Sequence, residues 1–162
     1  MPTISPDELR QVMRHWITGV TIVTCSDGNK QHGMTVNSFN SLSLDPPLIS
    51  IALNRGVRTQ RLIEKMAVFG VSILGADQAA ISDRFAGKIP ETEDRFAGES
   101  WFRLVSTAPL LSSALAALDC SVIYAYESKS SIVYIAEVVA GQILRDDRPL
   151  IYHNRTYHQL KD

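Results

Sequence analysis

Short runs of β-branched and other apolar residues recur along the whole chain, and this pattern restricts the fold more than any other feature. Such runs predict strands, and they cover residues 20–25, one extended region made of 32–39 and 41–44, then 48–53, 67–74, 132–144 and 150–154, with a further strand from about residue 119. Turn signals separate several of them, among them Asp27-Gly28 and the segments 128–131 and 145–149. Regular alternation of strands and helices is absent. About seven strands joined mostly by short turns predict a mainly β chain that closes into an antiparallel barrel with inserted helices.

The first inserted helix is expected within residues 5–16. Ser5 can cap it, Pro6 suits the first helical position, and Glu8 completes a capping box. Leu9, Val12, Met13 and Trp16 then share one apolar face.

Two more helices are expected, over residues 59–66 with Thr59 as the N-cap and over 77–87, ended by Gly87. Residues 110–118 begin like a helix, whereas 88–100 are polar and predict a loop. The 162 residues suffice for one core, and neither a repeat nor a linker is expected in them. A single domain over residues 1–162 is therefore expected.

Charge and composition restrict the partners. The net charge of −1 provides no overall basic field for nucleic acid or an acidic membrane. No apolar run approaches the roughly 18 residues of a membrane span, and the acidic, polar N-terminus does not resemble a signal peptide. Cys25 and Cys120 stand alone in apolar surroundings and form neither a CxxC nor a metal-ligand pattern, which favours reduced thiols in a cytoplasmic protein.

Several kinds of chemistry lack their motifs. No GxGxxG follows a strand and no GxxxxGK[ST] occurs, which argues against a Rossmann or P-loop nucleotide domain. Neither HExxH nor GxSxG is present, which argues against a zinc protease and a serine hydrolase. His153 and His158 are five residues apart, which is not the spacing of a shared metal on a strand or helix, so no metal site is expected.

The segment 33–53 combines small hydroxyl and amide residues with an apolar strand. A flat heterocycle such as an isoalloxazine ring needs hydrogen bonds at its edges and apolar contact on its faces. The candidate edge contacts are Thr35, Asn37, Ser38 and Ser41, and the candidate apolar contacts are Met34, Val36 and Ala52. The alternative interpretation is that these polar residues only decorate a strand.

An anion site is expected next to this segment. Arg58 and Thr59 stand at the start of a helix, and Arg61 lies one turn in. A phosphate there would be contacted by the free amides of the helix start, a hydroxyl and a guanidinium, and it would be stabilised by the helix dipole. The alternative is that Thr59 only caps the helix.

At these residues the chain resembles the flavin reductase family, the reductase components of two-component flavin monooxygenases. The matching motifs run in order from "GVTIVTC" through "HGMTVNSFNSLSLDPPLISIAL", "FGVSIL", "ISDRFAG", "DRFAG" and "ALAALDCSV" to "RPLIYHNRTYHQL". The resemblance implies an FMN-binding split barrel of Greek-key type that forms a homodimer. It also implies reduction of FMN or FAD by NADH or NADPH, with the reduced flavin passing to a separate monooxygenase.

The resemblance assigns roles to individual positions. By position, Thr35, Asn37 and Ser38 hold the flavin ring and ribityl chain, Ser41, Ala52 and Asn54 are neighbours, Arg58 and Thr59 contact the phosphate, and Arg84 and Phe85 form a second wall. Hydride transfer would depend on ring stacking and would need no catalytic side chain.

One departure from the family stands in the 128–131 connection. Relatives commonly have Gly-Asp-His where an ungapped count places Lys129, Ser130 and Ser131. Ser131 and Tyr157 are therefore candidate neighbours of the nicotinamide, with His153 as a further candidate. The missing histidine leaves open two alternatives to a reductase: a flavin-binding electron carrier or sensor, and a split barrel that has lost flavin.

Overall fold

The computed structural model describes residues 3–88, 90 and 94–160, and it is mainly β with three helices among the described residues. The helices are α1 (Pro6–Met13), α2 (Arg58–Met66) and α3 (Ala79–Phe85). The strands are β1 (Thr18–Gly19), β2 (Thr21–Ser26), β3 (Gln31–Val36), β4 (Asn40–Leu44), β5 (Pro47–Asn54), β6 (Val68–Ile73), β7 (Trp101–Phe102), β8 (Leu110–Leu111), β9 (Ala116–Glu127), β10 (Ser131–Ile143), β11 (Ile151–His153) and β12 (Thr156–His158).

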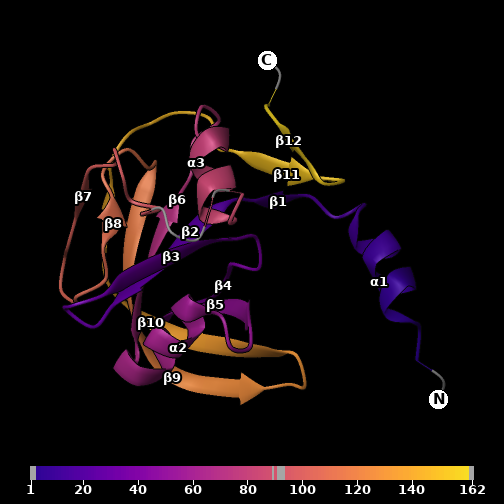
Figure 1. The fold of residues 1–162 in the computed structure, drawn as a ribbon, viewed down its shortest axis with the longest axis horizontal. Helices are drawn as coiled ribbons and strands as arrows, with labels where there is room; N and C mark the ends of the chain where they lie inside the picture. Colours follow the sequence, from indigo (N-terminus) through magenta and orange to yellow (C-terminus); the bar gives the residue numbers. More distant parts are fainter. Residues whose placement is uncertain (1–2, 89, 91–93, 161–162) are drawn as a thin grey trace.

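Seven antiparallel strands form one sheet in the order β3-β2-β6-β9-β10-β5-β4 (Figure 1). One core cluster nevertheless takes residues from both halves of this order, including Val36 of β3 and Ile51 of β5. Strands so far apart in the order share a core only when the sheet curls. At the seam Ser38, just after β3, hydrogen-bonds the backbone of Ala52 in β5. The curled antiparallel sheet confirms the split-barrel prediction.

Smaller elements lie at the two ends of this barrel (Figure 1). The sheet β1-β11-β12 lies beside α3 at one end, and a second apolar cluster, including Leu74, Phe85 and Leu150, joins them to the barrel. The helix α2 lies toward the other end, and α1 stands away from the body with none of its residues buried. Of the described helices, none has the length and apolar character that a membrane span requires.

The start of α1 is as predicted. The amide of Glu8 donates to Ser5 Oγ at 3.2 Å, and the amide of Ser5 donates to Glu8 Oε2 at 2.8 Å. The helix ends at Met13 and a turn follows, so it is shorter than the 5–16 range.

The prediction of a helix-like start over residues 110–118 is wrong. Leu110 and Leu111 form β8, and β9 begins at Ala116 rather than near residue 119. The first residues of β9 pair with β6 on one side and β10 on the other. Two neighbouring strands satisfy the backbone there, so tertiary pairing overrides the helix propensity of an Ala- and Leu-rich segment.

The prediction of Thr59 as an N-cap is also wrong. The helix α2 begins at Arg58, Val57 occupies the cap position, and no side chain caps it. Thr59 is fully buried, and its hydroxyl lies 2.8 Å from Nδ1 of His32 in β3. A partner far away in sequence therefore takes the hydroxyl that a cap would use.

Two further predictions need adjustment. The closing strand is one arm of a hairpin, because β12 pairs with β11 through a turn at Asn154 and Arg155. The expected loop 88–100 falls partly on residues 89 and 91–93, which lie outside the described residues.

Candidate functional site

Three adjoining cavities follow the outer strand β3 and form one channel, here called the β3 groove. The first, of about 540 Å³, has His32, Met34, Thr35, Arg58, Thr59 and Arg95 in its lining. The second, of about 310 Å³, shares Thr35 and Ala86 with the first. The third, of about 680 Å³, shares Asn37, Tyr152 and Arg155 with the second and reaches α1. Residues of β3 and of the segment just after it thus line a path from α2 to α1.

The α2 end of the groove is suited to an anion. The N-terminus of α2 opens into it, and three arginines, Arg58, Arg61 and Arg95, line it. Arg95 is held in place because its Nη1 donates to the carbonyls of Gly33 at 3.0 Å and Phe85 at 2.8 Å. The positive end of the helix dipole adds to these charges.

The middle of the groove contains a hydrogen-bonded network. Thr35 Oγ1 donates to the carbonyl of Ser82 at 2.5 Å, and Ser82 Oγ lies 2.8 Å from the hydroxyl of Tyr157. Tyr157 donates to Asp83 Oδ1 at 2.7 Å, and Lys88 Nζ lies 2.8 Å from the same carboxylate. This network joins β3, α3 and β12 across the groove.

The network also fixes protonation states. Hydrogen bonds from Lys88 and then Tyr157 hold the pKa of the Asp83 carboxyl below its ordinary value. Burial raises the pKa of the Tyr157 phenol above its ordinary value. Near neutral pH the groove therefore contains a neutral phenol that donates to a charged carboxylate.

The β3 groove brings together many of the predicted site residues, which are Met34, Thr35, Asn37, Ser38, Arg58, Thr59, Phe85 and Tyr157. Phe85 lies below the groove surface. Its ring is fully buried and packs edge-on against the ring of Phe96, with 5.1 Å between the ring centroids. The hydroxyl of Ser38 is engaged with the backbone of Ala52.

Other predicted residues lie elsewhere. Val36 is buried in the barrel core, and Ser41 is exposed in β4. Asn54 ends β5, where it pairs with Ser131. Arg84 donates to the carbonyl of Ala97 at 2.7 Å and forms an ion pair with Glu99 at 3.1 Å. The cofactor-contact assignments of these positions stay predictions.

The two candidate nicotinamide neighbours lie far apart. Tyr157 belongs to the β11–β12 hairpin and Ser131 to the β9–β10 hairpin, and Figure 1 shows these hairpins at opposite ends of the subunit. Within one subunit they cannot contact the same nicotinamide ring. The ring of His153 lies 5.6 Å from that of His158 across the β11–β12 hairpin.

Sequence reasoning missed five basic residues of the groove, which are Arg10, Arg14, Lys88, Arg95 and Arg155. A signal for Arg95 exists, because the pentapeptide DRFAG occurs twice, at 83–87 and 94–98. The two copies pack together through Phe85 and Phe96, and each arginine donates to a carbonyl of the other copy. Across residues 3–88, 90 and 94–160, no three His, Cys, Asp or Glu side chains gather as metal ligands.

Known proteins are similar to this chain in both sequence and architecture. Residues 13–161 match the model of the flavin reductase like domain. An NADH-dependent flavin reductase from Rhodococcus sp is 34% identical, with 99% of this chain and 89% of that protein covered. The reductase component of an FADH(2)-dependent resorcinol hydroxylase from Rhizobium sp. (strain MTP-10005) is 35% identical, with 91% and 83% covered.

A solved structure shows the same likeness in three dimensions. The NADH:FAD oxidoreductase of Streptomyces globisporus C-1027 superposes with a TM-score of 0.90 at 29% identity, and 100% of this chain and 99% of that chain are covered. Since the family model matches almost the whole chain, the chain belongs to the flavin reductase like domain family.

Proposed function

We propose that the chain is an NADH-dependent flavin reductase that binds FMN or FAD in the β3 groove. The observation that carries the proposal is the groove itself, which joins an arginine-lined helix N-terminus to the polar edge of β3. A flavin phosphate matches the first part, and the ribityl chain and ring match the second. The relatives named as NADH-dependent flavin reductase and NADH:FAD oxidoreductase support this choice of donor and acceptor.

A bound flavin supplies the hydride acceptor, and the role of the protein is to bind and orient it. Arg58, Arg61 and the start of α2 hold the phosphate, while Thr35 and Asn37 lie along the path of the ribityl chain and ring. The groove is open along one side, which lets a nicotinamide stack on the ring at about 3–3.5 Å.

Reduced flavin is proposed to pass to a separate flavin-dependent monooxygenase. The resorcinol hydroxylase relative is a reductase component, so it works beside another component. An open groove is suited to this role, because the product has to leave the protein before the oxygenase can use it.

A homodimer is proposed as the working form. Leu9, Val12 and Met13 on the apolar face of α1 are exposed, and so is Trp16 just after the helix, at 65%. Ile143 of β10, 83% exposed, and Tyr126 of β9, 58% exposed, add apolar surface on the long hairpin. A second copy would cover these surfaces, and two-fold pairing is the commonest closed arrangement. Sedimentation that shows a monomer with full flavin affinity would contradict this.

The cytoplasm is proposed as the compartment. Cys25 and Cys120 are both buried and unpaired. Free thiols in a small protein suit a reducing environment, which is also where NADH is supplied.

The test is oxidation of NADH by the purified protein with added FMN or FAD, followed at the NADH absorbance under anaerobic conditions. We expect bleaching of the flavin in step with NADH loss. Flavin binding without NADH oxidation would instead favour an electron carrier or sensor. Absence of flavin binding would mean that the barrel has lost the cofactor.

A further inference from the structure

A fourth cavity, of about 350 Å³, adjoins the anion end of the β3 groove and is here called the α2 cavity. Its lining consists of Arg55, Gly56, Gln60, Arg61, Glu64 and Ile132. Gly56 and Arg61 also line the β3 groove, so the two spaces meet at the start of α2. A ligand whose phosphate lies at that helix start can continue past Arg61 into the α2 cavity.

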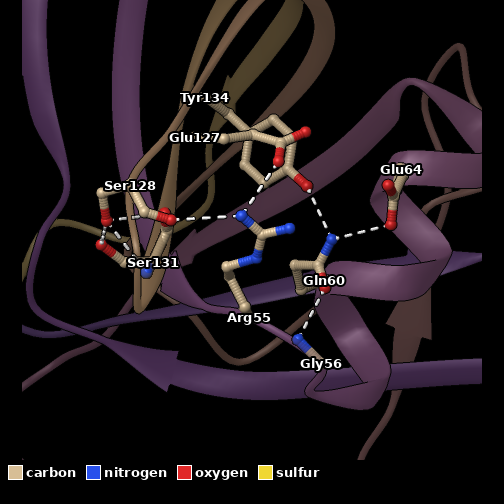
Figure 2. Close-up of polar contacts among 8 residues, drawn as sticks. All are labelled: Arg55, Gly56, Gln60, Glu64, Glu127, Ser128, Ser131 and Tyr134. Carbon is tan, nitrogen blue, oxygen red and sulfur yellow. Dashed lines mark hydrogen bonds and ion pairs between the residues drawn. The ribbon is translucent and has the colours of Figure 1, made fainter.

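A buried glutamine organises the walls of this cavity. Gln60 is 3% exposed, and its Oε1 accepts from the amide of Gly56 at 2.9 Å. Its Nε2 donates to Glu64 Oε2 at 3.0 Å and to the hydroxyl of Tyr134 at 3.2 Å (Figure 2). Gly56 has φ of +78°, a conformation that favours glycine. The turn before α2 and the carboxylate of Glu64 are therefore held in fixed positions.

The two arginines of the cavity differ in how they are held. Arg55 Nη1 forms an ion pair with Glu127 at 2.9 Å and donates to the carbonyl of Ser128 at 3.2 Å, which ties it to the β9–β10 hairpin (Figure 2). Within the described residues, the guanidinium of Arg61 has no hydrogen bond or ion pair. Arg61 can therefore turn toward a ligand in either space.

The charge of the cavity lining changes from positive to negative along α2. Positive charge gathers at the start of α2, on Arg55 and Arg61, and the carboxylate of Glu64 follows about one helical turn later. In the described part of the chain Glu64 Oε1 has no hydrogen-bond partner, so it can accept from a hydroxyl. Ile132, which is 4% exposed, contributes apolar surface to the lining.

We propose that the α2 cavity holds the adenylate half of FAD, which makes FAD a better ligand than FMN. The proposal rests on the flavin reductase function proposed above. From the flavin phosphate outward, FAD presents a second phosphate, a ribose with two hydroxyls and an adenine ring. Arg55 and Arg61 face the second phosphate, Glu64 accepts from the ribose as acidic residues do in dinucleotide sites, and Ile132 packs beside the adenine.

The test is to measure the Kd of FAD and of FMN by fluorescence titration for the wild type, Arg55→Met and Glu64→Gln, because Arg55 and Glu64 line the α2 cavity and not the β3 groove. The wild type should bind FAD more tightly than FMN. Each substitution should weaken FAD by about tenfold, the effect of losing one hydrogen bond to a charged group, and should weaken FMN by much less. Lys65→Met is the matched control, because Lys65 lies on α2 but pairs with Asp27 outside the cavity.

A competition experiment separates this site from the flavin site. AMP should displace FAD in part and should leave FMN bound. An unchanged ratio of the two affinities in both variants would overturn the proposal. So would a rise in KM for NADH with FMN as acceptor, because the cavity would then hold the adenylate of the nicotinamide cofactor. Failure of the reductase proposal looks different, since neither flavin would then bind to the wild type.

Discussion

Ser38 tests whether a polar residue of the groove contacts the flavin or only shapes the strand that does. Its hydroxyl donates to the carbonyl of Ala52 at 2.8 Å and accepts from the amide of Ala52 at 3.0 Å. These two bonds close the seam between the end of β3 and β5, where β4 no longer pairs with β5. Ser38→Ala removes both and leaves both backbone groups of Ala52 without that partner.

The expected cost follows from those two bonds. A neutral hydrogen bond contributes about 0.5–1.5 kcal/mol net, so two give about 1–3 kcal/mol. Ser38 is only half-buried, and water can replace part of the loss. We therefore expect the free energy of unfolding to fall by about 1–2 kcal/mol in urea denaturation. Flavin affinity should fall by less than about tenfold, because looser closure of the segment is the only route by which the change reaches the ligand.

Ser43→Ala is the control, since Ser43 lies in β4 and makes no side-chain hydrogen bond within the described residues. It should leave both quantities close to those of the wild type. The reasoning would be refuted by a Ser38→Ala protein with unchanged stability and strongly reduced flavin affinity. That result would mean that the hydroxyl binds the flavin directly, as the family resemblance implies.

Three further predictions concern the phosphate, the hairpin and the thiols. Arg58→Ala should weaken FMN more than riboflavin, because only FMN carries the phosphate that the start of α2 would hold, and equal losses would place the phosphate elsewhere. In the proposed homodimer the β9–β10 hairpin of one subunit would have to reach the groove of the other, and Ser131→His should then lower KM for NADH at saturating flavin, because an imidazole offers a flat ring and a donor. Ser128→Ala, which breaks the same hydroxyl pair, should not lower this KM. Unchanged kinetics in both variants would remove the hairpin from the hydride site. Burial raises the pKa of the Cys25 and Cys120 thiols to about 12, from an ordinary value of 9.0. The thiols of the unfolded chain therefore ionise at lower pH than those of the folded protein, and the free energy of unfolding should fall as pH rises from about 9 towards 12. In Cys120→Ala this fall with pH should be shallower than in the wild type. Equal slopes for the two proteins would contradict this.

The sequence predicts well those features that depend on neighbours along the chain. The capping box of Ser5 and Glu8 needs only four consecutive residues, and it forms as predicted. Strands rich in β-branched residues, such as β2 and β5, lie close to the predicted ranges because their composition has few alternatives. The segment before residue 119 has no such signature, since alanine and leucine suit a helix and a buried strand equally.

Features that depend on distant partners could not be predicted in this way. The hydroxyl of Thr59 pairs with His32, and no local rule connects the two. The same applies to the site, where one strand places Thr35 and Asn37 together but the rotation of α3 decides where Arg84 points. Arg155 reaches the groove only because β12 forms a hairpin with β11.

The hydrogen-bond arrangement along β3 explains how such a groove can bind a flavin and still release it. A hydroxyl has one proton, and the protons of Thr35 and Ser38 are already donated to the carbonyls of Ser82 and Ala52. Neither hydroxyl can donate to the flavin. Thr35 can only accept, which suits ribityl hydroxyls or the ring N3–H and not the ring carbonyls, while Ser38 stays engaged with the backbone of Ala52. The exposed amide of Asn37 has no partner in the described part of the chain and is free to donate. On the proposed function, the phosphate end supplies most of the affinity and the ring is held by few donors, which is the balance that a reductase needs when its reduced product has to leave.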